Sequence, residues 1–176
     1  CILIVPQRNP LVLAKELATL DRISGGRVEL GLGVGWLKEE FDALGVPWEA
    51  RGARNDEYVA AMRALWREPH VEFHGKYVDF DKVTCSPRPV NGSIPVIVGG
   101  DTDAALRRAA RHADGYFPGE GDPKKLVELI GRLHAEAENI GRDPAEIKIN
   151  FMFGAQMADP AAGIAELKAL GVDRIM

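Results

Sequence analysis

The chain has 176 residues, of which 46% are hydrophobic and 27% are charged, and its formal net charge is −4. These proportions are ordinary for a globular domain with a hydrophobic core, so they exclude disorder over most of the chain. The acidic balance, the lack of a dense basic patch and the lack of a long apolar run argue against a nucleic-acid-binding protein or a membrane protein.

Short apolar runs alternate with helical spacing along the chain, which is typical of βα units. The first run, CILIV at 1–5, predicts a strand that is buried on both faces. A helix is predicted from Pro10 and ends near Gly25. A second strand is predicted at 27–34, where glycines stop it, and a short helical piece follows at 37–43.

The middle of the chain departs from this rhythm. A longer helix is predicted over 53–67, where large apolar residues share one face. The segment VEFHGKYVDF at 71–80 predicts a β-hairpin with Gly75 in its turn, which we interpret as an insertion into the βα series. Proline, asparagine and glycine then mark an exposed connection to a strand at 94–100.

The alternation resumes after this strand and continues to the end of the chain. The predicted elements are a helix at 103–113, a strand at 115–117, a helix at 123–139, a strand at 147–156, a helix at 161–171 and a strand at 172–176. Such a series fits either an open doubly wound sheet or part of an eight-stranded α/β barrel. Because the chain begins and ends within predicted strands, we expect residues 1–176 to form one barrel domain that is truncated at both ends.

In either architecture, ligands bind at the carboxyl ends of the strands. The most informative loop there consists of Gly99, Gly100, Asp101 and Thr102. Its glycines allow backbone N–H groups to approach an anion, and the following helix N-terminus adds partial positive charge. Thr102 either donates to a phosphate oxygen or simply caps the helix. The carboxylates of Asp101 and Asp103 favour the simple cap, although Arg107 or Arg108, one turn on, could compensate for them. Both interpretations stand on the residues alone.

The end of the strand predicted at 27–34 and the loop that follows it present Gly33, Val34, Gly35 and Trp36. It lacks the third glycine of a dinucleotide-binding fingerprint. Exposed backbone at Gly33 and Gly35 beside Trp36 suits a flat aromatic ligand such as an isoalloxazine ring. The alternative is that Trp36 plugs the rim of the barrel.

Two further positions follow the first strand. Arg8 could hold an anionic ligand or substrate, and Asn9 before Pro10 is best explained as a helix N-cap. The two cysteines form no disulfide framework, which favours a cytoplasmic location.

The sequence shows no motif that is typical of catalysis without a redox cofactor. The four histidines show no metal-ligand spacing, and His74 is expected in an exposed hairpin turn. No serine has the context of a nucleophile elbow. We therefore assign no catalytic residue and no metal ligand, and expect a cofactor to perform the chemistry.

The run PQRNPLVLAKELATLDRISGGRVELGLGVGWLKEEFDALGV resembles the luciferase-like flavin monooxygenase superfamily, most closely its deazaflavin-dependent, actinobacterial-type branch. The similarity continues through RGARNDEYVAAMRALW, FHGKYVDF, CSPRPV, IPVIVGG and RRAARHADGYFPG. It covers nearly the whole chain. The resemblance implies a (β/α)₈ barrel, of which this chain covers the part from the third strand to the start of the eighth strand.

The resemblance also implies where a flavin-type cofactor binds. Gly33, Val34, Gly35 and Trp36 match the strand end that lines the cofactor, and Glu39 falls where some relatives place a polar contact. Gly99, Gly100, Asp101 and Thr102 match the turn that receives the cofactor phosphate. Ile2 is a further expected contact, because Cys1-Ile2 falls at a non-proline cis peptide bulge that supports the ring in relatives.

The function implied is an oxidoreductase that transfers a hydride, or activates oxygen, through the bound cofactor. Coenzyme F420 is favoured and FMN is the alternative, with a small organic molecule as substrate. We expect no nucleic-acid or membrane partner, and a homodimer for the full-length protein.

Two other functions stay open: a barrel enzyme that binds a phosphorylated substrate without flavin, and a cofactor-free scaffold protein. Because the acid–base residues are expected in the two missing strands, the isolated chain is predicted to aggregate or to bind weakly.

Overall fold

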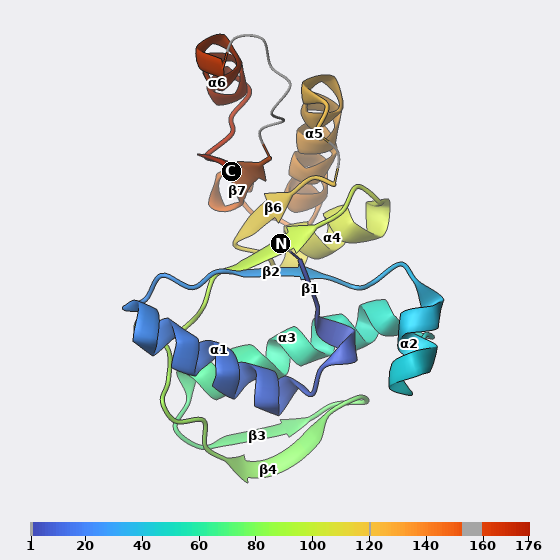
Figure 1. Cartoon of the computed structure of the whole chain (residues 1–176), viewed down its shortest axis with the longest axis vertical. Helices are drawn as coiled ribbons and strands as arrows, with labels where there is room; N and C mark the ends of the chain where they lie inside the picture. The colour runs from blue at the N-terminus through green and yellow to red at the C-terminus, as the bar shows by residue number, and fades with distance from the viewer. Residues whose placement is uncertain (1, 120, 153–159) are drawn as a thin grey trace. The chain divides into compact units, whose positions relative to one another are not determined.

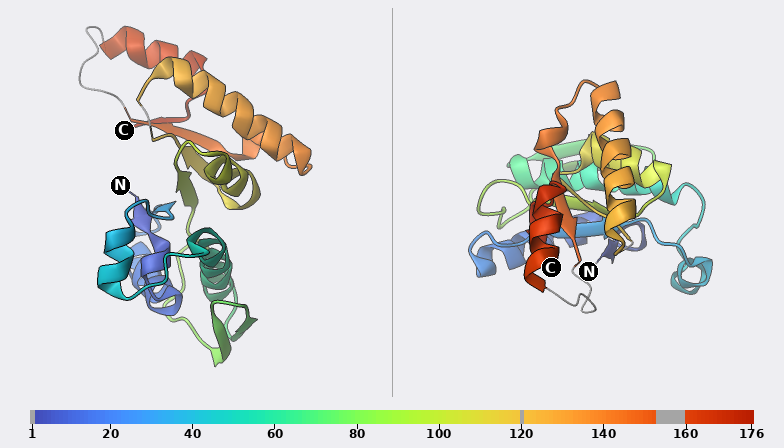
Figure 2. Two further views of the ribbon diagram at one scale, coloured as in Figure 1. Left: turned by 90° about the vertical axis from the view of Figure 1, so that its right-hand side faces the viewer. Right: turned by 90° about the horizontal axis from the view of Figure 1, so that it is seen from above.

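The computed structural model describes residues 2–119, 121–152 and 160–176 (Figures 1 and 2). Helices and strands follow one another in the predicted order. The chain divides into two compact units, Cys1–Pro95 and Val96–Met176. A single domain over 1–176 stays a prediction.

The first unit is built on a parallel strand pair and two long helices. β1 (Leu3–Ile4) pairs in parallel with β2 (Leu30–Gly33). The helix between them, α1 (Pro10–Ser24), packs against α3 (Arg51–Arg67) (Figure 1). A short helix, α2 (Lys38–Leu44), follows β2.

The ends of α1 are set by the residues that the sequence indicated. The side-chain oxygen of Asn9 accepts the backbone N–H groups of Leu11 and Val12 at 3.0 and 3.2 Å, which confirms the predicted cap. At the other end, Gly25 adopts a left-handed conformation with φ of 69° and stops the helix.

The strands are shorter than their apolar runs predict. β1 has only two residues because Val5–Gln7 form a 3₁₀ helix, η1, in which Pro6 has no N–H to donate to a neighbouring strand. The predicted strand 27–34 contracts to Leu30–Gly33. The predictions of strands over 1–5 and 27–34 were therefore wrong at their ends. Val5 is buried in the 3₁₀ helix rather than in a strand, and Arg27 and Glu29 before β2 are exposed.

The predicted hairpin is confirmed. β3 (Val71–His74) pairs antiparallel with β4 (Asp79–Val83), and the rings of Phe73 and Phe80 stack on one face with centroids 6.1 Å apart. Its turn occupies residues 75–78.

A carboxylate on α3 holds this turn. Glu57 accepts the backbone N–H groups of Lys76, Tyr77 and Val78 at 3.0, 2.6 and 2.8 Å. These hydrogen bonds tie the hairpin to α3, which precedes it in the chain. They hold the turn in place although its sequence lacks an Asn-Gly or Gly-Gly pair, which commonly forms tight hairpin turns.

The core of the first unit lies between α1 and α3. The largest side chain within it, Trp66, is fully buried, and its indole N–H donates to the carbonyl oxygen of Ala14 at 3.0 Å. Asp21 is only 3% exposed and accepts the backbone N–H groups of Val28 and Val90 at 3.2 and 2.8 Å. The buried carboxylate thus joins α1 to two loops.

The second unit is a parallel sheet with its connecting helices. The strands lie side by side in chain order, as β5 (Val96–Gly99), β6 (Gly115–Phe117), β7 (Lys148–Phe151) and β8 (Arg174–Ile175). Residues 153–156 of the predicted strand 147–156 lie outside the described part of the chain.

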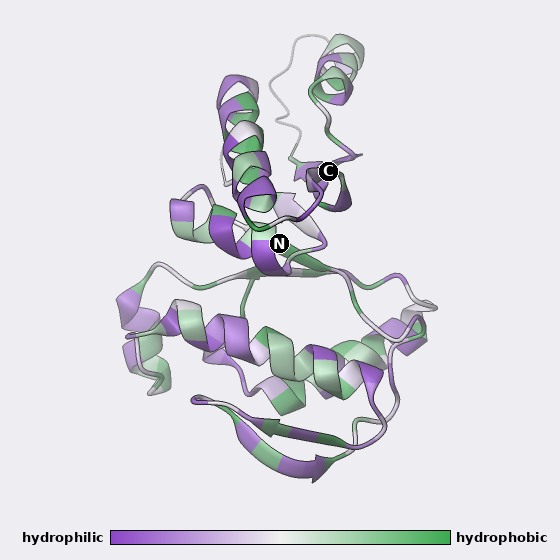
Figure 3. Ribbon diagram, turned by 180° about the vertical axis from the view of Figure 1, so that it is seen from behind, coloured by the Kyte–Doolittle hydropathy of each residue, from purple (hydrophilic) through white to green (hydrophobic). Residues whose placement is uncertain are grey.

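Three helices connect these strands, namely α4 (Asp103–His112), α5 (Pro123–Asn139) and α6 (Pro160–Ala169). α5 has the predicted bounds, and it buries Leu126, Leu129, Leu133 and Ala137 at helical spacing. Hydrophobic and hydrophilic residues alternate accordingly along the helices in Figure 3. Among the described residues, no helix has both the length and the apolar character needed to cross a membrane.

Candidate active site

The turn between β5 and α4 begins with backbone that favours glycine. Gly100 has φ of 113°, and its N–H donates to the carbonyl oxygen of Phe117 at 3.2 Å. Thr102 then caps α4, since its hydroxyl oxygen accepts the N–H of Ala105 at 3.2 Å. The hydroxyl acts as the acceptor in this bond, so its own proton can still be donated to a ligand.

Asp101 connects this turn to the end of β6. Its carboxylate accepts the N–H of Gly119 at 2.7 Å and lies 3.3 Å from the hydroxyl of Tyr116, which also lies 3.1 Å from the carbonyl oxygen of Gly100. Burial, and next the Asp101 carboxylate, raise the pKa of Tyr116 above its ordinary range. Tyr116 therefore stays a neutral donor that holds the turn in place.

The second acidic residue of the turn is neutralised from another helix. Arg132 of α5 pairs with Asp103 and lies 3.3 Å from Glu128. Arg107, one of the two arginines that the sequence suggested for this role, has its guanidinium 3.9 Å from the Glu136 carboxylate instead. Arg132 was not identified from the sequence, because it lies 29 residues from Asp103 in the chain and no local pattern links residues so far apart.

The first turn of α4 keeps donors for an anion. The first N–H groups of any helix have no acceptor within the helix. Thr102 satisfies the N–H of Ala105. Within the described residues, the N–H groups of Asp103 and Ala104 are left to an external acceptor, where the helix dipole favours negative charge.

An open cleft of about 470 Å³ lies beside β1, in the first unit. One side consists of Ile2, Leu3, Ile4, Gln7 and Arg8, and the other consists of Glu40, Ala43 and Leu44 of α2. The amide of Gln7 donates to the carboxylate of Glu40 at 3.3 Å. The cleft therefore combines apolar walls with an amide, a carboxylate and a guanidinium, as pockets for small organic molecules do.

Two of the predicted contact residues, Ile2 and Arg8, lie together in this cleft. Glu39 does not line it and is exposed in the first turn of α2, whereas its neighbour Glu40 faces the cleft. Glu40, Ala43 and Leu44 have i, i+3, i+4 spacing, which is the signal that could have identified this face. Cys1 lies outside the described residues, and the predicted peptide bulge at Cys1-Ile2 lies there with it.

Close packing explains the glycine that ends β2, Gly33, and the glycine two residues further on, Gly35. A methyl group on Gly33 would lie 2.7 Å from Cγ2 of Ile2. Gly35 has φ of 83°, and a methyl group there would lie 2.6 Å from the ring of Phe41. Trp36 is 83% exposed, so its ring is not part of the core.

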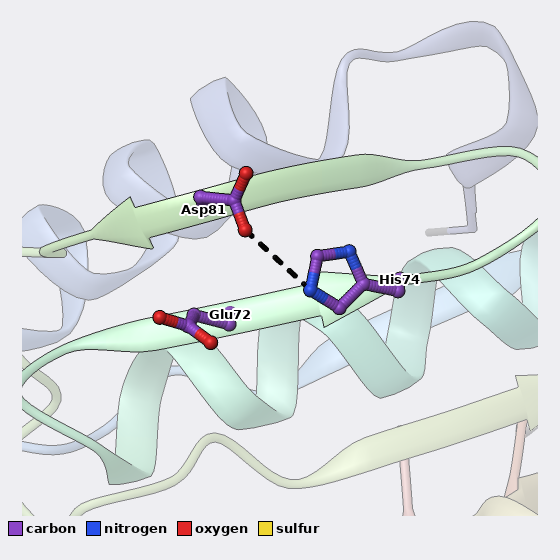
Figure 4. A group of neighbouring side chains, drawn as sticks. All are labelled: Glu72, His74 and Asp81. Carbon is purple, nitrogen blue, oxygen red and sulfur yellow. Dashed lines mark ion pairs between the residues drawn. The ribbon is translucent and has the colours of Figure 1, made fainter.

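A second group of polar side chains lies on the hairpin. Figure 4 shows Glu72 and His74 on β3 and Asp81 on β4. His74 Nδ1 lies 2.7 Å from Asp79 Oδ1, and His74 Nε2 lies 3.5 Å from Asp81 Oδ1. His74 was expected in the turn, but it is the last residue of β3.

His74 is expected to titrate above its ordinary pKa of 6.5, because the hydrogen bond to Asp79, followed by the charges of Asp79, Asp81 and Glu72, favours the imidazolium. A raised pKa stabilises the folded hairpin fully below pH 6.5, and this contribution is lost as pH rises through the raised value. NMR titration of the His74 ring should show this pKa fall in Asp79→Asn. An unchanged pKa in that variant would refute the assigned cause.

Comparison with known proteins places these features in context. A family model described as "Luciferase-like monooxygenase" matches residues 1–169. An uncharacterized protein of Mycobacterium tuberculosis is 38% identical over 176 residues, which are 99% of this chain and 59% of that protein. An FMNH₂-dependent dimethylsulfone monooxygenase of Pseudomonas putida is 33% identical over 133 residues, which are 73% of this chain and 37% of that protein.

A solved structure is also similar. The coenzyme F420-dependent tetrahydromethanopterin reductase of Methanopyrus kandleri matches with a TM-score of 0.72 and 25% identity, over 94% of this chain and 57% of that chain. The fold class is thereby confirmed as part of a (β/α)₈ barrel. The chain spans only 59% of the length of the M. tuberculosis relative and 37% of the length of the P. putida relative.

Proposed function

Because the chain belongs to the luciferase-like monooxygenase family, we propose that it is part of an oxidoreductase that binds coenzyme F420, with FMN as the alternative. The P. putida relative is FMNH₂-dependent and the M. kandleri structure is F420-dependent, so the family contains users of both. We favour F420 because the sequence motifs resemble those of the deazaflavin-dependent branch of the family.

The observation that carries this proposal is the β5–α4 turn. It combines positive-φ backbone at Gly100, a hydroxyl proton on Thr102 and the N–H groups at the start of α4. Arg132 offsets the charge of Asp103. This arrangement suits a phosphate group, because main-chain donors and the helix dipole act on the anion together.

Residues of the cleft beside β1 would bind and orient the substrate. When bound, the cofactor supplies hydride transfer. In the cleft beside β1, Arg8 would hold an anionic group of a substrate, and the Gln7–Glu40 pair would accept or donate a hydrogen bond. The apolar wall of Ile2 and Leu44 would exclude water from that side. A homodimer of the full-length protein stays a prediction.

The proposal is tested by Ala104→Glu, a substitution at an exposed position in the first turn of α4. The new carboxylate would repel a phosphate at the turn, and we expect the Kd for F420 and for FMN to rise by about tenfold or more, which corresponds to roughly 1.4 kcal/mol. Stability should hold or rise by about 0.3–1 kcal/mol, because negative charge is favourable at a helix N-terminus. Fluorescence titration and thermal unfolding measure the two effects.

The matched control is Ala135→Glu, which adds the same charge at an exposed position within α5. It should leave both Kd values unchanged. Equal Kd values for Ala104→Glu and the unmodified protein would reject the phosphate role of the turn. Binding of inorganic phosphate without either cofactor would favour the non-flavin enzyme instead.

A further inference from the structure

We propose that the β3–β4 hairpin binds a divalent transition-metal ion, such as Zn²⁺, through Glu72, His74 and Asp81 (Figure 4). None of these three residues belongs to the β5–α4 turn or lines the cleft beside β1. The metal site does not depend on the proposed oxidoreductase function.

The three side chains converge from two strands. Glu72 and His74 are two residues apart on β3, and alternation along a strand places them on the same face. Asp81 reaches this face from β4. One ligand atom from each residue lies within 4.8 Å of the other two.

The closest pair already has the spacing of metal ligands. His74 Nε2 lies 3.5 Å from Asp81 Oδ1. Two ligands of a tetrahedral zinc ion are about 3.3 Å apart when each bond is about 2.0 Å long. All three side chains are exposed, so the carboxylate of Glu72 can rotate inward without repacking a core.

Asp79 prepares the imidazole for this role. Its carboxylate lies 2.7 Å from His74 Nδ1, and an ionised carboxylate can only accept a hydrogen bond, so Nδ1 carries the proton. In the neutral ring, the lone pair is then on Nε2, the atom that faces Asp81. A carboxylate bonded to the other ring nitrogen is the usual support of a metal-bound histidine.

The hairpin holds these ligands on a fixed framework. Phe73, between Glu72 and His74 in the chain, points to the opposite face and stacks on Phe80. Glu57, on α3, accepts hydrogen bonds from three backbone N–H groups of the hairpin turn. The ligand face is therefore ordered before any ion arrives, which lowers the entropy lost on binding.

The donor set indicates the class of ion. One imidazole nitrogen with two carboxylate oxygens suits Zn²⁺, Co²⁺ or Ni²⁺, whereas Mg²⁺ and Ca²⁺ prefer oxygen ligands alone. Glu72, Asp79 and Asp81 place three carboxylates around one imidazole, and a divalent cation would offset their mutual repulsion.

Titration calorimetry with Zn²⁺ alone, in a buffer free of chelators, tests the site. We expect one ion per chain, with affinity reduced at least tenfold by His74→Ala and by Asp81→Asn. Asp79→Asn should weaken binding by about 10–100-fold, because it removes the support of the imidazole. His70→Ala is the control, since His70 contacts Thr84 at 3.0 Å, outside the triad, and it should bind as the unmodified protein does.

NMR of the unmodified protein gives a readout that does not depend on whether a variant folds. Zn²⁺ should shift the Nε2 resonance of His74 and leave that of His70 in place. Equal Zn²⁺ affinity in His74→Ala, or an equal loss in His70→Ala, would overturn the proposal. Ala104→Glu should not change Zn²⁺ affinity, so failure of the cofactor proposal would leave this result unaffected.

Discussion

Trp66→Ala is expected to lower the free energy of unfolding by about 3–5 kcal/mol, the usual cost of removing a large buried aromatic side chain. Trp66 is fully buried between α1 and α3, so the substitution leaves a cavity. It also leaves the carbonyl oxygen of Ala14 without the indole N–H that it accepts. Urea unfolding followed by circular dichroism would measure the change.

Trp36→Ala is the matched control, because Trp36 is 83% exposed. The same substitution there should change the free energy of unfolding by no more than about 0.5 kcal/mol. If Trp36 contacts the cofactor, as the family resemblance implies, this variant should bind cofactor more weakly while it stays folded. Similar destabilisation by both variants would contradict the burial described for Trp66.

Asp21→Ala should cost about 2–6 kcal/mol of stability, because two backbone N–H groups lose their acceptor and each such loss costs about 1–3 kcal/mol. The two donors are the backbone N–H groups of Val28 and Val90, and Val90 lies 69 residues after Asp21 in the chain. Asp21→Asn should cost less, since the amide oxygen can still accept. Denaturant unfolding of both variants would show this order.

A surface carboxylate provides the comparison for Asp21. Asp42 pairs with Lys38 at 2.6 Å one turn away on α2, and both side chains are more than half exposed. Asp42→Ala should therefore cost less than about 1 kcal/mol. An equal cost for the two aspartates would show that Asp21 is not held as described.

The helices were predictable because their signals are local. α5 begins after Asp122, whose carboxylate accepts the N–H of Lys124, and its apolar residues recur at helical spacing to the end. The hairpin was predictable from its alternation. Strand ends were not, because Val5 is buried in a 3₁₀ helix rather than in a ladder, and an apolar run cannot distinguish the two.

The candidate site was predictable only in part. The β5–α4 turn and Arg8 follow strands directly, so their position at strand ends could be derived. The pairs Arg132–Asp103 and Gln7–Glu40 join residues 29 and 33 positions apart. Such contacts depend on how elements pack, and no local periodicity encodes them.

The bond between Glu57 and the hairpin turn has a consequence for folding order. The turn amides of Lys76, Tyr77 and Val78 find their acceptor on a helix that ends before the hairpin begins. An isolated two-stranded hairpin is marginal in water. We therefore expect the hairpin to mature after α3 has formed, and we expect its turn amides to be protected from solvent exchange only while that helix is intact.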